Sequence, residues 1–307
     1  MKAKNVNAVL CKKFDDFTAS IDDEHLRELV EQNAIITGGA IASMLLGDKV
    51  YDFDIYFRDH DTTLAVAQHY VSRFANNPPP RFKASGQEVT IHVEDKDGRV
   101  RIYVKSAGIA GEAEENEYEY FEQTDPEGVN AAEYIAKVLN VVQDTEDADK
   151  GKPKYRPVFL SSNAITLSHT VQLIVRFYGE PDQIHENYDF VHCTNYWTSW
   201  DRKLTLRPAA VESLLARELR YVGSKYPLCS IIRTRKFIQR SWAITAGQYL
   251  KMAMQLNELD LQNIAVLEDQ LMGVDTYYFT QVIKLLKKRD PSRIDTAYLV
   301  ELIDKIF

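Results

Sequence analysis

Two short features at a fixed separation most constrain how this chain can fold. A glycine pair, Gly38-Gly39, follows the apolar run 34–36, and the alternating segment 51–57 (YDFDIYF) begins a dozen residues later. The apolar run predicts a strand, residues 40–46 predict a compact helix, and 51–57 predicts a second strand. The sequence therefore predicts a unit of strand, glycine turn, helix and strand, with the turn and the second strand at one edge of a sheet.

The second strand carries a pair of carboxylates. Asp52 and Asp54 lie two residues apart, so their side chains should share one face while Phe53 and Ile55 point into the core. Hard oxygen ligands of this kind suit magnesium. A glycine turn that opens a helix adds close backbone approach and exposed N–H groups, which favour a phosphate. Together these features suit metal-assisted chemistry on a phosphate, such as nucleotidyl transfer, whereas an acidic pair on a solvated sheet face is the alternative for the carboxylates alone.

The same segment resembles a known family. Residues 38–54 read GGAIASMLLGDKVYDFD. In ungapped register this resembles the GGxhRDxLLGxxxxDxD motif of bacterial-type CCA-adding tRNA nucleotidyltransferases and poly(A) polymerases, which belong to the polymerase β-like superfamily. Ala42-Ser43 stands where that family has Arg-Asp. The resemblance implies Mg²⁺ held by Asp52 and Asp54, and nucleotide contacts from Gly38, Gly39 and Ser43.

Two later segments extend the resemblance in the same chain order. Residues 171–177 (VQLIVRF) are similar to the family's VExxxxFR strand, with Gln172 at the Glu position. Residues 188–191 (YDFV) resemble its RRDFT motif without the paired arginines. On this resemblance Arg176 contacts the nucleotide and Asp189 is a third acidic, metal-binding residue of the catalytic set. A structural role for Asp189, capping a strand expected at 188–197, explains it equally well.

Beyond residue 207 the pattern is helical, and one helix concentrates positive charge. Residues 219–242 loosely resemble the link from head to neck in the same enzymes. Within them Arg233, Lys236 and Arg240 fall at steps of three and four, hence on one helix face that can hold a triphosphate or an RNA backbone. A solvated surface helix is the alternative. Helices are expected at 209–221, 228–240, 246–257, 267–272, 277–288 and 294–306.

The remaining pattern completes the expected fold class. Helices are expected at 22–32, 61–74 and near 130–142, a hairpin at 89–94 and 99–105, strands at 164–167 and 171–177, and a helical turn from Pro181. The sequence thus predicts an α+β protein. A mixed-sheet, polymerase β-like nucleotidyltransferase head should span 1–205, with an acidic insert near 106–157, and a helical domain should span 206–307.

Charge and cysteine usage narrow the class of protein. The formal net charge is −8, yet residues 201–250 hold ten basic residues against three acidic ones, and residues 106–150 hold thirteen acidic residues against two lysines. The chain is therefore charge-segregated. No apolar stretch is long enough for a membrane span, and three cysteines without CxxC spacing favour neither a disulfide framework nor a zinc site. We expect a cytoplasmic protein without a membrane partner.

Three functions remain open at this stage. The first is transfer of an NMP from an NTP, with Mg²⁺, to an RNA acceptor resembling tRNA. The second keeps the chemistry but uses a small molecule or a protein as acceptor, as in resistance or toxin adenylyltransferases; the acidic segment 112–122 suits a cationic acceptor. The third is a binding protein of the same fold without turnover, motivated by the missing arginines and opposed by the intact Asp52 and Asp54.

Overall fold

The computed structural model describes residues 1–77, 89–106, 154–160 and 163–261, together with residues 263, 266, 267 and 270. By their contacts, the described residues form two compact units. We call them the head unit, which contains the described residues up to His185 and the segment Cys193–Arg207, and the helical unit, which contains Glu186–His192 and the described residues from Pro208 onward. The domain boundary expected between 205 and 206 stays a prediction.

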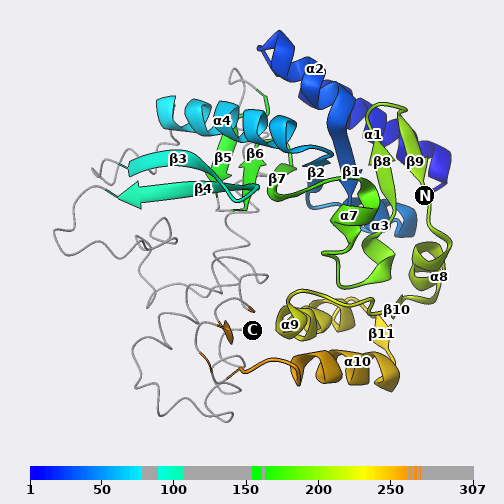
Figure 1. The fold of residues 1–307 in the computed structure, drawn as a ribbon. Helices are drawn as coiled ribbons and strands as arrows, with labels where there is room; N and C mark the ends of the chain where they lie inside the picture. The colour runs from blue at the N-terminus through cyan, green and yellow to red at the C-terminus, as the bar shows by residue number, and fades with distance from the viewer. Residues whose placement is uncertain are drawn as a thin grey trace, which may run out of the picture. The chain divides into compact units, whose positions relative to one another are not determined.

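A mixed sheet forms the centre of the head unit. Within the described residues it has seven strands in the order β5-β6-β7-β2-β1-β8-β9 (Figure 1). Strands β2 and β7 run parallel, and the other neighbours run antiparallel. The expected α+β class with a mixed sheet is confirmed. The strands are β1 Ala34–Thr37, β2 Phe53–Phe57, β5 Pro157–Leu160, β6 Ala164–Leu167, β7 Val171–Tyr178, β8 Tyr196–Thr198 and β9 Lys203–Thr205.

Several helices of the head unit begin or end at a capping residue. Asp23 caps α2 by accepting the N–H of Leu26, and Asp59 caps α4 by accepting that of Thr62. Helix α3 ends at Gly47, which adopts the left-handed conformation with φ 80°. The helices are α1 Ala3–Thr18, α2 Glu24–Asn33, α3 Gly39–Leu46, α4 His60–Asn76 and α7 Pro181–His185.

Helix α1 was not expected from the sequence, although its pattern is regular. Val6, Leu10, Phe14 and Phe17 recur at helical spacing and are all buried in the same core as the sheet. The Phe14 ring lies 5.1 Å from the ring of the fully buried Trp197 on β8. The N-terminal helix is therefore an integral layer of the head unit.

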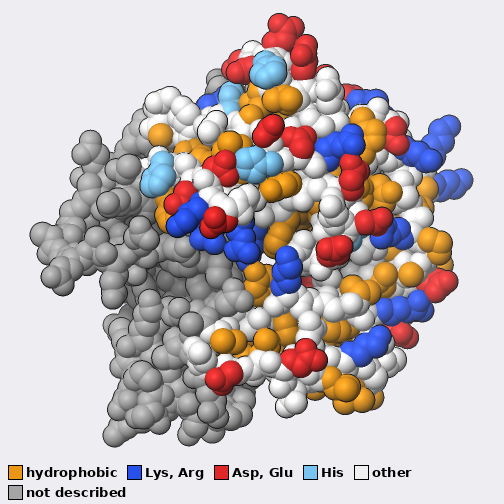
Figure 2. All heavy atoms as spheres, in the orientation of Figure 1, with side chains coloured by type: hydrophobic (Ala, Val, Ile, Leu, Met, Phe, Trp, Pro, Cys, Tyr) orange, Lys and Arg blue, Asp and Glu red, His pale blue; other side chains and the backbone are white. Residues whose placement is uncertain are grey.

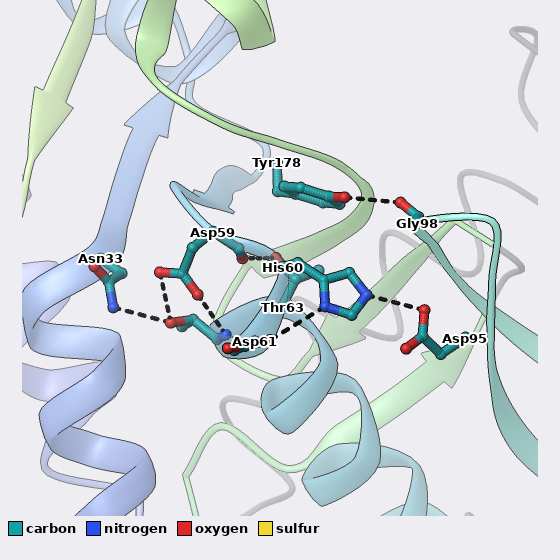
Figure 3. A network of polar contacts seen from close by, with 9 residues as sticks. Asn33, Asp59, His60, Asp61, Thr63, Asp95, Gly98 and Tyr178 are labelled. Atoms are coloured by element: carbon teal, nitrogen blue, oxygen red, sulfur yellow. Dashed lines mark hydrogen bonds and ion pairs between the residues drawn. The ribbon is translucent and has the colours of Figure 1, made fainter.

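The expected hairpin is confirmed as β3 (Val89–Lys96) and β4 (Arg99–Ser106). Its two-residue turn, Asp97-Gly98, has positive φ at both positions, as tight hairpins require. Figure 3 shows how the hairpin contacts the rest of the head unit: His60 Nε2 pairs with Asp95 Oδ1 at 2.9 Å, and the Tyr178 hydroxyl donates to Gly98 O at 2.8 Å. The start of α4 and the end of β7 thus hold the hairpin turn.

The helical pattern predicted beyond residue 207 is confirmed within the described residues. The helical unit contains α8 Pro208–Ala216, α9 Pro227–Ile238 and α10 Ala246–Leu256, with short parallel strands β10 Glu218–Leu219 and β11 Ala243–Ile244. Its core includes His192, whose ring lies 4.8 Å from that of Phe237 and 4.4 Å from that of Trp242. None of the helices in the described part of the chain has the length and apolarity needed to cross a bilayer.

Two expected elements were wrong in extent. The strand expected at 188–197 is a bend, then the 3-10 turn η2 (Val191–Cys193), and only Tyr196–Thr198 forms strand. The helix expected at 209–221 ends at Ala216, because Arg217 takes a positive φ and the next residues pair with β11. The helices expected at 130–142, 277–288 and 294–306, and most of 267–272, lie outside the described residues.

Candidate active site at the β1–β2 edge

The glycine turn and the carboxylate pair meet through strand register. In the antiparallel pairing of β1 and β2, Thr37 lies directly opposite Asp54. Thr37 is the last residue of β1, so Gly38 follows at once, while Phe53 begins β2 at the same end. The structure therefore places the turn and Asp54 at one edge of the sheet, as the sequence pattern predicted.

The two sheet faces differ in chemistry at this point. Phe53 and Ile55 are buried in the core, as expected, so Asp54 points to the opposite face. In the parallel pairing of β2 with β7, Gln172 is the register partner of Asp54. Asp54 therefore stands between a threonine and a glutamine on the neighbouring strands, on the face away from the core.

Asp52 lies one residue before β2 rather than within it. The adjoining Phe53 is restrained in two ways: its side chain is buried, and its N–H donates to Thr170 O at 2.8 Å. Both Asp52 and Asp54 are partly exposed. The carboxylates thus flank a residue whose backbone is fixed, which limits their freedom relative to each other.

The turn itself requires glycine at its first position. Gly38 is the N-cap of α3 with φ 97° and ψ −151°, a conformation that side chains disfavour, and its N–H donates to Cys193 O at 3.2 Å. Gly39 begins α3, and an added Cβ there would meet no atom within 4 Å. The first-turn N–H groups of a helix lack partners within it and attract anions. Ser43 lies one turn further along α3 and is partly exposed.

A buried polar cluster, which the sequence did not predict, holds Thr37 immediately before the glycine turn. Thr37 is fully buried, and its Oγ1 lies 2.9 Å from His185 Nε2 and donates to Asn195 O at 3.0 Å. Because the hydroxyl proton goes to a carbonyl, the His185 ring nitrogen is the donor to Thr37. Burial, together with the smaller effect of the Arg207 charge, lowers the pKa of His185 to about 4, so the imidazole is neutral at neutral pH. Only tertiary structure assembles this cluster, because its members lie on separate segments.

The carboxylate oxygens at this end of β2 are of the hard type that magnesium takes in proteins. Among the described residues, no group of three or more His, Cys, Asp or Glu side chains is arranged to hold a metal ion. Magnesium in nucleotide sites is commonly held by one or two carboxylates together with substrate phosphates. Asp52 and Asp54 are the residues that would hold it here, next to the N-terminus of α3.

The other expected site residues lie elsewhere. Arg176 is four residues beyond Gln172 on β7, past an irregularity in the β2–β7 pairing, so register gives it no place beside Asp54. In the helical unit, Arg233 Nη1 donates to Asp189 Oδ2 at 2.6 Å. The Asp189 side chain is only 12% exposed, so this ion pair satisfies a nearly buried carboxylate. The roles of Arg176 and Asp189 in nucleotide and metal binding stay predictions.

Much of the basic charge beyond residue 200 is engaged in ion pairs. Arg202 pairs with Asp15 and Arg207 with Asp182 in the head unit; Arg220 pairs with Glu212, and Arg233 with Asp189, in the helical unit. Figure 2 shows acidic and basic side chains interspersed over the described face. Lys236 is exposed on α9, whereas Arg240 lies beyond Ile238, where that helix ends. The single basic helix face expected from the sequence is therefore divided.

Solved structures with similar folds include tRNA-processing enzymes. A Thermotoga maritima CCA-adding enzyme complexed with tRNA is 11% identical, over 94% of this chain and 54% of that one, with a TM-score of 0.42. A Bacillus stearothermophilus CCA-adding enzyme in complex with CTP is 11% identical, over 88% and 51%, with a TM-score of 0.39. A tRNA nucleotidyltransferase complexed with a primer tRNA and an ATP analogue is 12% identical, over 83% and 57%, with a TM-score of 0.34. The chain spans about half the length of these structures.

A family model matches the part of the chain that contains the candidate site. No curated protein sequence matches this chain. A family model described as Gabija anti-defense 2 family protein matches residues 8–217. That span is most of the 307-residue chain and includes the glycine turn, both carboxylates and the anchoring cluster of Thr37, His185 and Asn195. The chain therefore belongs to the Gabija anti-defense 2 family.

Proposed function

We propose that this protein acts against Gabija defence as a magnesium-dependent nucleotidyltransferase, which moves an NMP from an NTP to an acceptor. The observation that carries the proposal is the register of Thr37 opposite Asp54, since it brings Asp54, with Asp52 two residues before it, to the same sheet edge as a helix N-terminus opened by glycine. One group of residues suits a divalent cation and the other suits a phosphate.

The proposed reaction joins an acceptor oxygen to the α-phosphorus of the NTP. The bond from that phosphorus to the bridging oxygen breaks, pyrophosphate leaves with the bonding electrons, and the acceptor proton passes to solvent. Asp52 and Asp54 would position the cation, and the N–H groups at the start of α3 would hold triphosphate oxygens. Magnesium, when bound, supplies positive charge that offsets the charge on the leaving pyrophosphate.

RNA is the acceptor that the motif order favours. Lys236 and Arg240 are exposed in the helical unit, and exposed cations of this kind bind a phosphate backbone. Arg233 contributes less to this proposal, because it pairs with Asp189.

A protein acceptor is the second candidate, and the family assignment favours it. A protein that counters a defence system can act by modifying a component of that system, and nucleotidyl transfer to a side-chain hydroxyl uses the same site. The ion pairing of Arg202, Arg207, Arg220 and Arg233 with acidic side chains also reduces the charge available to RNA.

Labelled NTPs separate these possibilities. The full chain is incubated with each α-labelled NTP, Mg²⁺, and in turn total tRNA and an extract of cells that carry Gabija, and the products are separated. We expect label on an acceptor with wild type and none with Asp52→Asn/Asp54→Asn. Label on tRNA supports the first candidate, and label on a protein supports the second. Equal label with the double variant, or no label with any acceptor, overturns nucleotidyl transfer.

A further inference from the structure

Lys13 of α1 is a charged residue that the proposed reaction does not use, yet it lies close to the site. Its Nζ donates to the carbonyl of His169 and lies 3.4 Å from Thr170 Oγ1. The same ammonium lies 5.1 Å from the centre of the Phe53 ring and 5.4 Å from that of Tyr155. All of these residues belong to the head unit. One side chain of the N-terminal helix therefore contacts both the β6–β7 turn and the start of β2.

The turn that Lys13 contacts has an unfavourable backbone. His169 and Thr170 adopt φ values of 64° and 57°, and Tyr155, whose ring lies 5.3 Å from that of His169, adopts 54°. Positive φ is uncommon for residues other than glycine and asparagine, and it is least tolerated by β-branched residues such as threonine. Such a conformation persists only where surrounding contacts hold it. Lys13 supplies two of them, at His169 O and Thr170 Oγ1.

The β6–β7 turn also contacts the backbone between the two carboxylates. Thr170 O accepts the N–H of Phe53 at 2.8 Å, and the next residue, Val171, is the register partner of Phe53. Phe53 is the residue between Asp52 and Asp54. A series of contacts thus leads from the Lys13 ammonium to the Thr170 hydroxyl, and from the Thr170 carbonyl to the Phe53 N–H between the two carboxylates.

We propose that Lys13 is a positioning residue for the Asp52 and Asp54 site: it holds the positive-φ turn, and the turn fixes Phe53. Its effect on catalysis rests on the proposed function, whereas its effect on the Phe53 backbone does not. The positive charge also lies against the face of the Phe53 ring, a favourable arrangement that adds to the same restraint.

Amide hydrogen exchange at Phe53 tests the structural link without any assumption about activity. In Lys13→Met the aliphatic stem is kept and both hydrogen bonds are lost. We expect Phe53 to exchange about tenfold faster than in wild type, the change that follows from weakening one or two hydrogen bonds. Lys12→Met is the matched control, because Lys12 is the exposed neighbour on the same helix. Unchanged exchange at Phe53 in Lys13→Met overturns the inference.

A rescue variant distinguishes action through the turn from a general loss of charge. Thr170→Gly accepts positive φ without strain. In Lys13→Met/Thr170→Gly the turn should stay closed, and Phe53 exchange should return toward the wild-type rate. Failure of this rescue overturns the role of the turn. If Lys13→Met does not fold, Lys13→Arg and Lys13→Gln provide the same comparison. Lys13→Arg retains a donor and the charge, so we expect Phe53 to exchange more slowly in Lys13→Arg than in Lys13→Gln.

Binding of Mn²⁺ with a non-hydrolysable ATP analogue, followed by electron paramagnetic resonance, tests the consequence for the site. Lys13→Met should weaken Mn²⁺ binding about tenfold, as loss of one supporting contact around a metal site does, and the rescue variant should recover it. Faster Phe53 exchange with unchanged Mn²⁺ affinity overturns the positioning role. A wild-type protein that binds no Mn²⁺ with the analogue overturns the proposed function and the metal part of this inference, while the exchange data still decide the Lys13 link.

Discussion

Thr37 faces Asp54 across the β1–β2 pair, and its hydroxyl is held by the ring of His185 and the carbonyl of Asn195. The residue that ends β1 is therefore both the register partner of a candidate metal ligand and the anchor of the glycine turn. These contacts restrain the end of β1, and a site for an oriented triphosphate requires such restraint.

Neutralising either carboxylate should sharply reduce turnover without unfolding the chain. Asp54→Asn and Asp52→Asn retain the shape of the side chain but remove a negative oxygen from the candidate metal site. Because such a site contributes several kcal/mol to the transition state, we expect a loss on the order of 10³-fold in the rate of label transfer. Thermal unfolding should be close to that of wild type. Turnover within twofold of wild type in both variants would exclude these residues as metal ligands.

The two glycines should respond differently to alanine. Gly38→Ala forces a side chain into φ 97° and should destabilise the protein by on the order of 1–3 kcal/mol. Gly39→Ala meets no atom within 4 Å and should leave the free energy of unfolding within about 0.5 kcal/mol of wild type. Urea unfolding measures both. If the start of α3 holds phosphates, Gly39→Ala should still weaken nucleotide binding, because its methyl group lies where they approach; equal ATP affinity would argue against that position.

Acid should destabilise the head unit through His185. Its pKa is lowered from 6.5 to about 4, first by burial and then by Arg207, so the folded state resists protonation that the unfolded state accepts. The stabilisation is complete above pH 6.5 and is lost as the pH falls toward 4, by about 3 kcal/mol in all. Unfolding followed from pH 7.5 to 4.5 should have a shallower pH dependence in His185→Gln. His25→Gln, at an exposed histidine, is the control and should keep the wild-type slope.

Removing Arg233 should reduce stability more than removing Lys236. Arg233→Gln leaves the nearly buried carboxylate of Asp189 without its ion pair, and because the guanidinium is 41% exposed we expect a modest cost of about 1–2 kcal/mol. Lys236→Gln, at an exposed residue, should cost less than Arg233→Gln. If RNA binds this helix, Lys236→Gln should weaken binding and reduce its salt dependence, measured by fluorescence anisotropy with tRNA. The opposite ranking of the two variants in stability would contradict the ion-pair assignment.

Local pattern alone determined much of the head unit. The glycine pair, the alternating Asp52–Asp54 segment and the apolar runs of β6 and β7 have short-range signatures, so the order of strand, turn, helix and strand was predicted correctly. Helix α1 was missed even though Val6, Leu10 and Phe14 have clear helical spacing. The segment 188–197 was misread because alternating aromatic residues indicate a strand, whereas contacts with Tyr221 and Trp242 bury this segment as a turn.

Long-range pairing decided what the sequence could not. Nothing local indicates that Asp54 has Gln172 and Thr37 as neighbours, that Arg233 pairs with Asp189, or that Lys13 holds a turn more than 150 residues away. The physical reason is that residue type and spacing set which face of an element is apolar, but register and burial emerge only when elements pack. The sequence by itself identified the candidate carboxylates and the glycine turn as a candidate phosphate site; only the tertiary structure determined which side chains support them.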